Sequence, residues 1–128
     1  MFTHVMVGAK DLAQSKAFYD AVFAAIGGGE GQEFRPGVVF YAHNGGMFGV
    51  GLPADGNEAS RANGGTIGFA AAGKEQVDAW HAAGLANGGS TAGDPGKRPQ
   101  APGNAYGAYL RDPIGNKICA FCQLPEGA

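Results

Sequence analysis

The feature that most constrains the fold is a repeated order of elements along the two halves of the chain. Residues 4–27 begin with a strand-like segment rich in β-branched and apolar side chains, and a helical pattern of apolar residues follows. Residues 66–88 repeat this order over nearly the same length. We therefore interpret the chain as an internal duplication of one supersecondary unit.

Local signals define the first copy in more detail. Asp11 and Gln14 form a D-x-x-Q capping box that predicts a helix start, and Gly27 is the residue type that favours a left-handed helix end. The pair Asn44-Gly45 is a strong hairpin signal. Three short strands are predicted after the helix, around residues 32–34, 38–42 and 47–52.

The second copy has the same plan after a linker rich in Pro, Gly, Asn and Ser. A strand, a helix and later strands are predicted at residues 66–70, 74–87, 90–92, 106–110 and 117–122. The chain should be a single α+β domain, with module one at about 1–52, the linker at about 53–64 and module two at about 65–124. Two such units can keep their helices outside and curve their sheets around a shared hollow, the natural ligand site.

The composition narrows the class of partner. The chain has 128 residues, 45% of them hydrophobic, so we expect a folded domain with a real core. The net charge is only -2 and no Lys/Arg stripe is present, which argues against nucleic acid and acidic membranes as partners. No secretory signal pattern or long apolar run is visible, so we expect a cytoplasmic protein.

Three segments carry a resemblance to a known family. They are the strand that starts His4-Val-Met-Val, the helix start Asp11-Leu12 with Phe18-Tyr19, and the hairpin Asp112-Pro-Ile-Gly-Asn116 before the last strand. Together they resemble the vicinal oxygen chelate superfamily, which includes glyoxalase I, bleomycin-resistance proteins and extradiol dioxygenases. The resemblance covers nearly the whole chain. It implies two βαβββ modules that form curved mixed sheets around a cavity, and a homodimer is expected.

The resemblance also implies where a divalent metal would be held in metal-using relatives. Carried over by position, the three ligand positions fall on His4, Thr66 and Cys119, and a fourth falls near Phe48 or Val50. A hard divalent ion prefers imidazole and carboxylate ligands, and a hydroxyl and a thiol replace two of the three here. We therefore expect no cofactor, with a divalent metal as the alternative.

Strand periodicity indicates which side chains face the cavity. Alternation turns His4 and Met6 toward it, and a four-residue loop before the last strand would place Cys119 opposite Ala108 and Phe121 opposite Tyr106. A shift of one residue would bring Tyr109 to that face instead. His43 is expected to be solvated. The predicted cavity residues are His4, Met6, Phe48, Thr66, Arg98, Tyr106, Cys119 and Phe121.

Several functions fit this pattern, and whether the chain is an enzyme stays open. The favoured hypothesis is a protein that binds a small aromatic or amphipathic molecule without the usual metal. The alternatives are a metal-dependent lyase of the lactoylglutathione lyase type or a dioxygenase with an atypical ligand set, and a thiol-dependent enzyme that uses Cys119 with His4. A homodimeric module with a filled cavity is a further hypothesis. The sequence does not indicate whether the modules pair within one chain or across a dimer.

Overall fold

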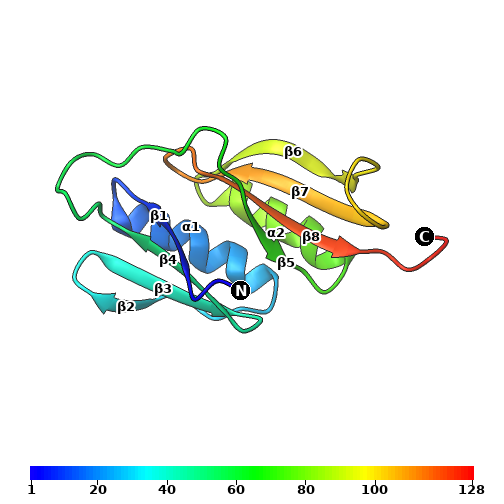
Figure 1. Cartoon of the computed structure of the whole chain (residues 1–128), viewed down its shortest axis with the longest axis horizontal. Coiled ribbons are helices and arrows are strands. Elements are labelled where there is room, and N and C mark those ends of the chain that lie inside the picture. Colours follow the sequence, from blue (N-terminus) through cyan, green and yellow to red (C-terminus); the bar gives the residue numbers. More distant parts are fainter.

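The chain forms two βαβββ modules, which confirms the predicted α+β architecture (Figure 1). The structure is a computed structural model that describes residues 1–128. Module one consists of β1 (Val5–Gly8), α1 (Leu12–Ala25), β2 (Gln32–Arg35), β3 (Val38–His43) and β4 (Gly46–Gly51). Module two consists of β5 (Ile67–Ala70), α2 (Lys74–Ala86), β6 (Ser90–Lys97), β7 (Ala105–Arg111) and β8 (Lys117–Gln123).

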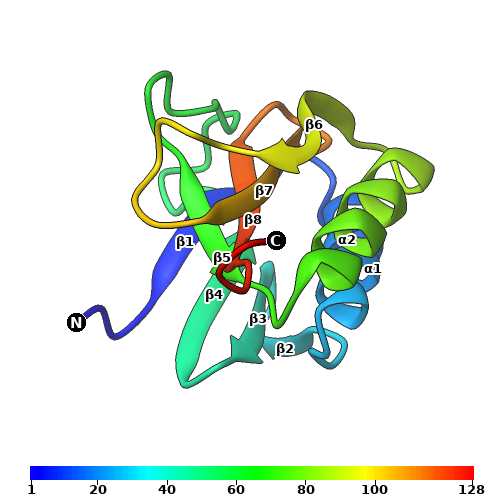
Figure 2. The same ribbon diagram turned by 90° about the vertical axis from the view of Figure 1, so that its right-hand side faces the viewer.

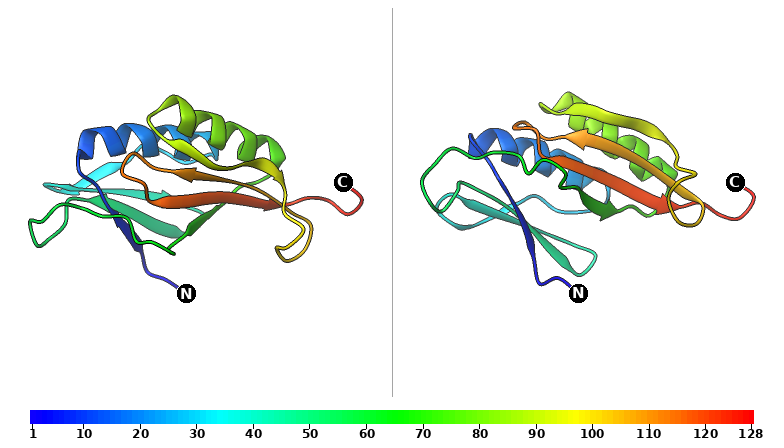
Figure 3. Two further views of the ribbon diagram at one scale, coloured as in Figure 1. Left: turned by 90° about the horizontal axis from the view of Figure 1, so that it is seen from above. Right: turned by 45° about the horizontal axis from the view of Figure 1, so that its top comes forward.

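Each module builds its own four-stranded mixed sheet. The strand orders are β1-β4-β3-β2 and β5-β8-β7-β6. In both sheets the first strand of the module pairs parallel with the last, and the remaining pairs are antiparallel. The linker between the modules loops out at the end of the molecule opposite the C-terminus (Figures 1 and 3).

Both helices cover the same side of the two sheets (Figure 2). The side chains of Phe18, Tyr19 and Phe23 on α1 and of Val77 and Trp80 on α2 are almost completely buried there, in one core shared by both modules. Neither helix is long and apolar enough to cross a membrane. The opposite side of the sheets carries no helix, and we call it the open face.

The predicted cap and turn residues lie at the two ends of α1 and in the β3–β4 hairpin, as their sequence signals indicate. The Asp11 carboxylate accepts a hydrogen bond of 3.1 Å from the backbone N–H of Gln14, so Asp11 caps α1. Gly27 follows the helix with a φ of 84°. Asn44 and Gly45, with φ values of 48° and 81°, form the two-residue turn between β3 and β4 that their sequence predicts.

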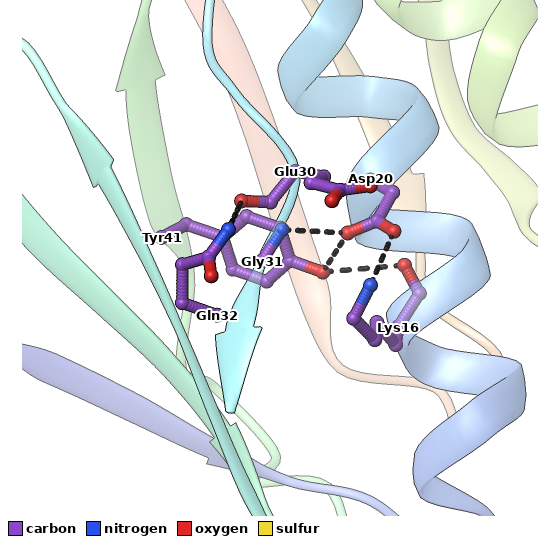
Figure 4. Close-up of polar contacts among 6 residues, drawn as sticks. All are labelled: Lys16, Asp20, Glu30, Gly31, Gln32 and Tyr41. Atoms are coloured by element: carbon purple, nitrogen blue, oxygen red, sulfur yellow. Dashed lines mark hydrogen bonds and ion pairs between the residues drawn. The ribbon is translucent and has the colours of Figure 1, made fainter. Parts of the chain in front are cut away.

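A polar cluster at Asp20 fixes α1 to the sheet of module one (Figure 4). One carboxylate oxygen accepts hydrogen bonds from the Gly31 N–H (2.8 Å) and the Tyr41 hydroxyl (2.7 Å), and the other accepts one from Lys16 Nζ (2.8 Å). Burial raises the pKa of Asp20, but these donors together outweigh it, so the pKa is lowered. The carboxylate therefore stays ionised where the helix meets β2 and β3.

Apart from the linker, every contact that joins the two modules involves a side chain. No backbone–backbone hydrogen bond connects module one to module two. The shared core crosses the boundary, and so do three hydrogen bonds from side chains: His43 Nε2 to Ala70 O (2.8 Å), Tyr19 Oη to Asp112 Oδ2 (2.7 Å) and Asn116 Nδ2 to Gly8 O (3.1 Å).

The Asp112 carboxylate accepts one of these inter-module hydrogen bonds together with several from its own turn. Its side chain is buried and accepts hydrogen bonds from the Tyr19 hydroxyl, from Asn116 Nδ2 (2.8 Å) and from three backbone N–H groups of the β7–β8 turn, at residues 114–116. Five donors satisfy a carboxylate that would otherwise be costly to bury. The Asp-Pro-x-Gly-Asn segment thus forms the turn and holds it against module one.

Candidate functional site

A pocket of about 370 Å³ lies where the two modules meet. It is open to solvent between the start of β1, the β3–β4 hairpin and strand β5, and its size is within the range of small-molecule sites. We call it the seam pocket. Its floor and walls include Phe23, Tyr41, Phe48 and Phe69, and its rim includes His4, His43, Asn44, Met47, Gly68 and Ala70.

Three phenylalanine rings from both modules make the floor of the seam pocket. The Phe69 ring centre lies 4.9 Å from that of Phe23 and 5.1 Å from that of Phe48, both in edge-to-face geometry. All three residues are less than 10% exposed, so the floor belongs to the shared core. Edge-to-face packing fixes the rings, and the pocket therefore offers a rigid apolar surface.

Two imidazoles stand at the rim above this floor. His43 lies at the end of β3, and its Nε2 is 2.8 Å from the Ala70 carbonyl oxygen in β5. A carbonyl only accepts, so Nε2 carries the proton and Nδ1 is left for another partner. The exposed His4 has its Nδ1 2.9 Å from the Thr3 hydroxyl.

The prediction that His43 is solvated holds only in part, because the side chain is partly exposed but its Nε2 contacts Ala70 of module two. A signal was available in the sequence. Val39, Tyr41 and His43 alternate along β3, and Val39 and Tyr41 face the core, so His43 leaves the strand on the same side. His43 is the last residue of β3, directly before the Asn44-Gly45 turn.

The structure does not assemble His4, Thr66 and Cys119 into a ligand set. His4 lines the seam pocket, whereas Thr66 is exposed just before β5 and neither Thr66 nor Cys119 lines that pocket. No group of three His, Cys, Asp or Glu side chains is placed to hold a metal ion. These donors do not fit a divalent metal of the kind the family resemblance implies.

Cys119 is placed as a buried, protonated thiol. It lies opposite Gly68 in the β5–β8 pair and is only 7% exposed. Burial raises the pKa of the thiol to about 11, and the nearby Lys117 ammonium lowers it only in part. A thiol with this pKa is a poor nucleophile at neutral pH, since the thiolate is the reactive form.

Of the two registers that the sequence left open, the structure has the one that places Tyr109, and not the cavity candidate Tyr106, on the face of Cys119. In the β7–β8 pair Tyr109 lies opposite Cys119, and Tyr106 lies opposite Cys122 on the side that faces α2. The Tyr106 hydroxyl donates a hydrogen bond of 2.6 Å to Asp78 of α2. The turn spans five residues instead of four, because Asp112 holds Asn116 within it, and this extra residue moves Tyr109 to the open face.

The other predicted cavity residues divide between the core and the open face. Phe48 is 5% exposed and is a core residue that meets the seam pocket only at its floor. Met6 is 42% exposed on the open face of β1. Phe121 packs beside Tyr109 on the open face of module two, with ring centres 5.7 Å apart, and Arg98 lies over the same Tyr109 ring.

Solved structures support this architecture. A glyoxalase/bleomycin resistance protein from Albidiferax ferrireducens T118 is 50% identical, with a TM-score of 0.89 over 98% of this chain and 99% of that one. A lactoylglutathione lyase from Agrobacterium tumefaciens is 25% identical, with a TM-score of 0.66 and coverage of 94% and 92%. A glyoxalase-related enzyme from Fulvimarina pelagi, at 20% identity, shares the fold with a TM-score of 0.75 and coverage of 94% and 86%.

The family model agrees with these structures. Among curated proteins, none matches the chain. The model of the Glyoxalase/Bleomycin resistance protein/Dioxygenase superfamily matches residues 1–120, which include both modules up to the last strand. The chain therefore belongs to the glyoxalase/bleomycin resistance protein/dioxygenase superfamily.

Proposed function

We propose that the chain binds a small aromatic or amphipathic molecule in the seam pocket and does so without a divalent metal. The observation that carries the proposal is the floor of three phenylalanine rings, contributed by both modules, beneath a rim with two imidazoles. An apolar pocket with a few polar groups at its edge is the usual form of a small-molecule site.

The chemistry of the pocket favours a flat apolar group with one polar end. Aromatic rings prefer edge-to-face or offset contacts, which the exposed edges of the floor can offer to a bound ring. The polar end would then lie near the rim, where His43 Nδ1 has no partner within the chain and Asn44 is exposed. Such an arrangement orients a ligand without reaction at a metal or a thiol.

The test uses N-phenyl-1-naphthylamine, a neutral dye that fluoresces in apolar surroundings, and one blocking variant. Ala70 is exposed and lines the seam pocket, so Ala70→Phe fills the pocket without changing the core. Ala42 is also an exposed strand residue on an open sheet face but lies outside the pocket, so Ala42→Phe is the matched control. We expect Ala70→Phe to weaken dye binding by at least about tenfold, or about 1.4 kcal/mol.

Equal effects of the two variants would refute the seam pocket as the binding site, provided that both keep the wild-type unfolding midpoint.

The proposal that binding needs no divalent metal has its own test. Dye affinity should be the same with and without EDTA, because the pocket holds no imidazole–carboxylate ligand set. Zinc binding that supports dye affinity and disappears in His4→Ala would contradict it.

A further inference from the structure

A second polar feature lies on the open face of module two, outside the seam pocket. The guanidinium carbon of Arg98 is 5.7 Å from the centre of the Tyr109 ring, and Lys117 Nζ is 5.1 Å from the same centre. Tyr109 and Lys117 come from adjacent strands, β7 and β8, and Arg98 follows β6 directly. We call Arg98, Tyr109 and Lys117 the cationic ledge.

The Arg98 side chain is held in place by its surroundings. Nη2 donates a hydrogen bond of 2.6 Å to the Asp94 carbonyl oxygen, and Nη1 donates a longer one of 3.4 Å to the Lys97 carbonyl. Its nitrogen atoms lie above Gly93 and Gly96, where a Cβ atom would come within 3.3 and 3.2 Å of them. Glycine at these positions leaves room for the guanidinium beside β6, and its remaining N–H groups have no partner within the chain.

The charge of the ledge has no counterion within the chain. The ion pairs of the molecule involve Lys10, Lys16 and His81, and none includes Arg98 or Lys117. The Asp94 carboxylate, the nearest acidic group in sequence, instead accepts a hydrogen bond of 3.0 Å from the Thr91 hydroxyl. Because the whole chain carries a net charge of -2, two unpaired cations at one aromatic ring are a local feature and not a general excess.

The ledge is connected to the seam pocket by the strand register. Gly68, which lines the pocket, lies opposite Cys119, and Cys119 lies opposite Tyr109. These three residues form one row across β5, β8 and β7 on the open face, so two strand spacings of roughly 4.8 Å, or about 10 Å, separate the pocket from the ledge. Gly68 has no side chain and Cys119 a short one that is 7% exposed, so these two residues add little bulk to the row.

We propose that the cationic ledge is an anion subsite that receives the oxyanion of a ligand whose apolar part occupies the seam pocket. The inference rests on the proposed function and narrows it to amphipathic anions, such as aryl or alkyl carboxylates, with about 10 Å between the apolar group and the charge. The guanidinium supplies fixed N–H donors and the lysine supplies a second positive charge, the usual combination for an oxyanion.

The test compares two ligands that differ only in charge. 6-Phenylhexanoate and 6-phenylhexan-1-ol have the same apolar part, and each is used to displace N-phenyl-1-naphthylamine from the protein. We expect the carboxylate to bind about tenfold more tightly than the alcohol at low salt, and this preference to shrink as salt is added. Arg98→Gln and Lys117→Gln should each remove most of the preference.

Lys97→Gln is the matched control, since it removes the same charge beside Arg98. Lys97 lies opposite Tyr106 and therefore leaves the sheet on the helix side, so this variant should keep the preference for the carboxylate. Equal affinities for the two ligands, or a preference that Arg98→Gln leaves intact, would overturn the anion subsite. Dye binding that is insensitive to Ala70→Phe would instead overturn the seam pocket, so the two failures are distinct.

Discussion

Removal of one hydroxyl group, in Tyr19→Phe, tests how the two modules are held together. The Tyr19 hydroxyl donates a hydrogen bond of 2.7 Å to Asp112 Oδ2, and the two residues are 0% and 3% exposed. Burial and the Asp112 carboxylate raise the pKa of Tyr19 well above its usual value, so the phenol stays protonated and remains a donor at physiological pH.

The size of the effect follows from the surroundings of this bond. A hydrogen bond to a charged group contributes about 1.5–3 kcal/mol. Removal of one partner leaves the other buried with neither a hydrogen-bond partner nor water, which adds a desolvation cost. Asp112 keeps four other donors in the variant, so we expect a loss near the middle of that range, about 2 kcal/mol. For a chain of this size that corresponds to a decrease in melting temperature of roughly 6–10 °C.

Urea unfolding followed by the fluorescence of Trp80 measures the loss. Trp80 is the single tryptophan and is fully buried in the shared core, so its emission reports on both modules. Tyr106→Phe is the control, since its hydroxyl also donates to a carboxylate, Asp78, at 2.6 Å, but in a partly exposed place. We expect this control to lose less than about 1 kcal/mol. Equal losses in the two variants would refute the argument that the Asp112 connection stabilises the joint.

Two predictions concern ionisable groups. In a Cys122→Ala background, iodoacetamide should modify Cys119 at pH 8 roughly a hundredfold more slowly than free cysteine, because burial raises the pKa of the Cys119 thiol to about 11. A modification rate whose pH dependence gives the pKa of free cysteine would contradict this prediction. The pKa of Asp20 is lower in the folded than in the unfolded chain, so its contribution to stability is complete above the unfolded value of about 4 and is lost as the pH falls through the folded one. Urea unfolding between pH 6 and the acid limit should therefore show a steeper loss for the wild type than for Asp20→Asn, and parallel curves would count against the role of Asp20.

Local chemistry made most of the fold predictable. The order of strands and helices, the cap at Asp11 and the turn at Asn44-Gly45 depend on residues within a few positions of one another, and the structure contains all of them. The repeated plan then constrained the strand directions, because the helix crossover sets the second strand of each module parallel to the first, and the two antiparallel pairs that follow set the last strand parallel to the first as well.

The orientation of the β7 side chains was harder to predict from the sequence, because it depends on the exact length of one turn. A turn of four residues and a turn of five differ by a single residue, yet they exchange Tyr106 and Tyr109 between the two faces. The deciding interaction is the Asp112 carboxylate, which binds the N–H groups of the turn and also contacts Tyr19 from the other module. The pattern of apolar residues along one strand does not predict a contact with the other module.

The seam pocket was the least predictable part of the molecule. Its floor combines Phe23, Phe48 and Phe69 from a helix and two strands of different sheets, and their proximity depends on the angle between the modules. Sequence periodicity identified these residues as apolar but not as neighbours. His4 alone among the predicted polar residues lines the pocket, while Thr66 and Cys119 lie outside it.

The absence of backbone hydrogen bonds between the modules has a consequence for how such a protein can acquire new ligands. A substitution at the joint, at Phe69 or His43 for example, alters the shape of the seam pocket while every strand keeps its hydrogen-bonded neighbours. Packing across the joint can readjust by small shifts of one rigid half against the other, a motion that continuous sheets do not permit. The duplicated architecture thus leaves the hydrogen-bonded order of the strands within each module independent of the side chains that shape the joint.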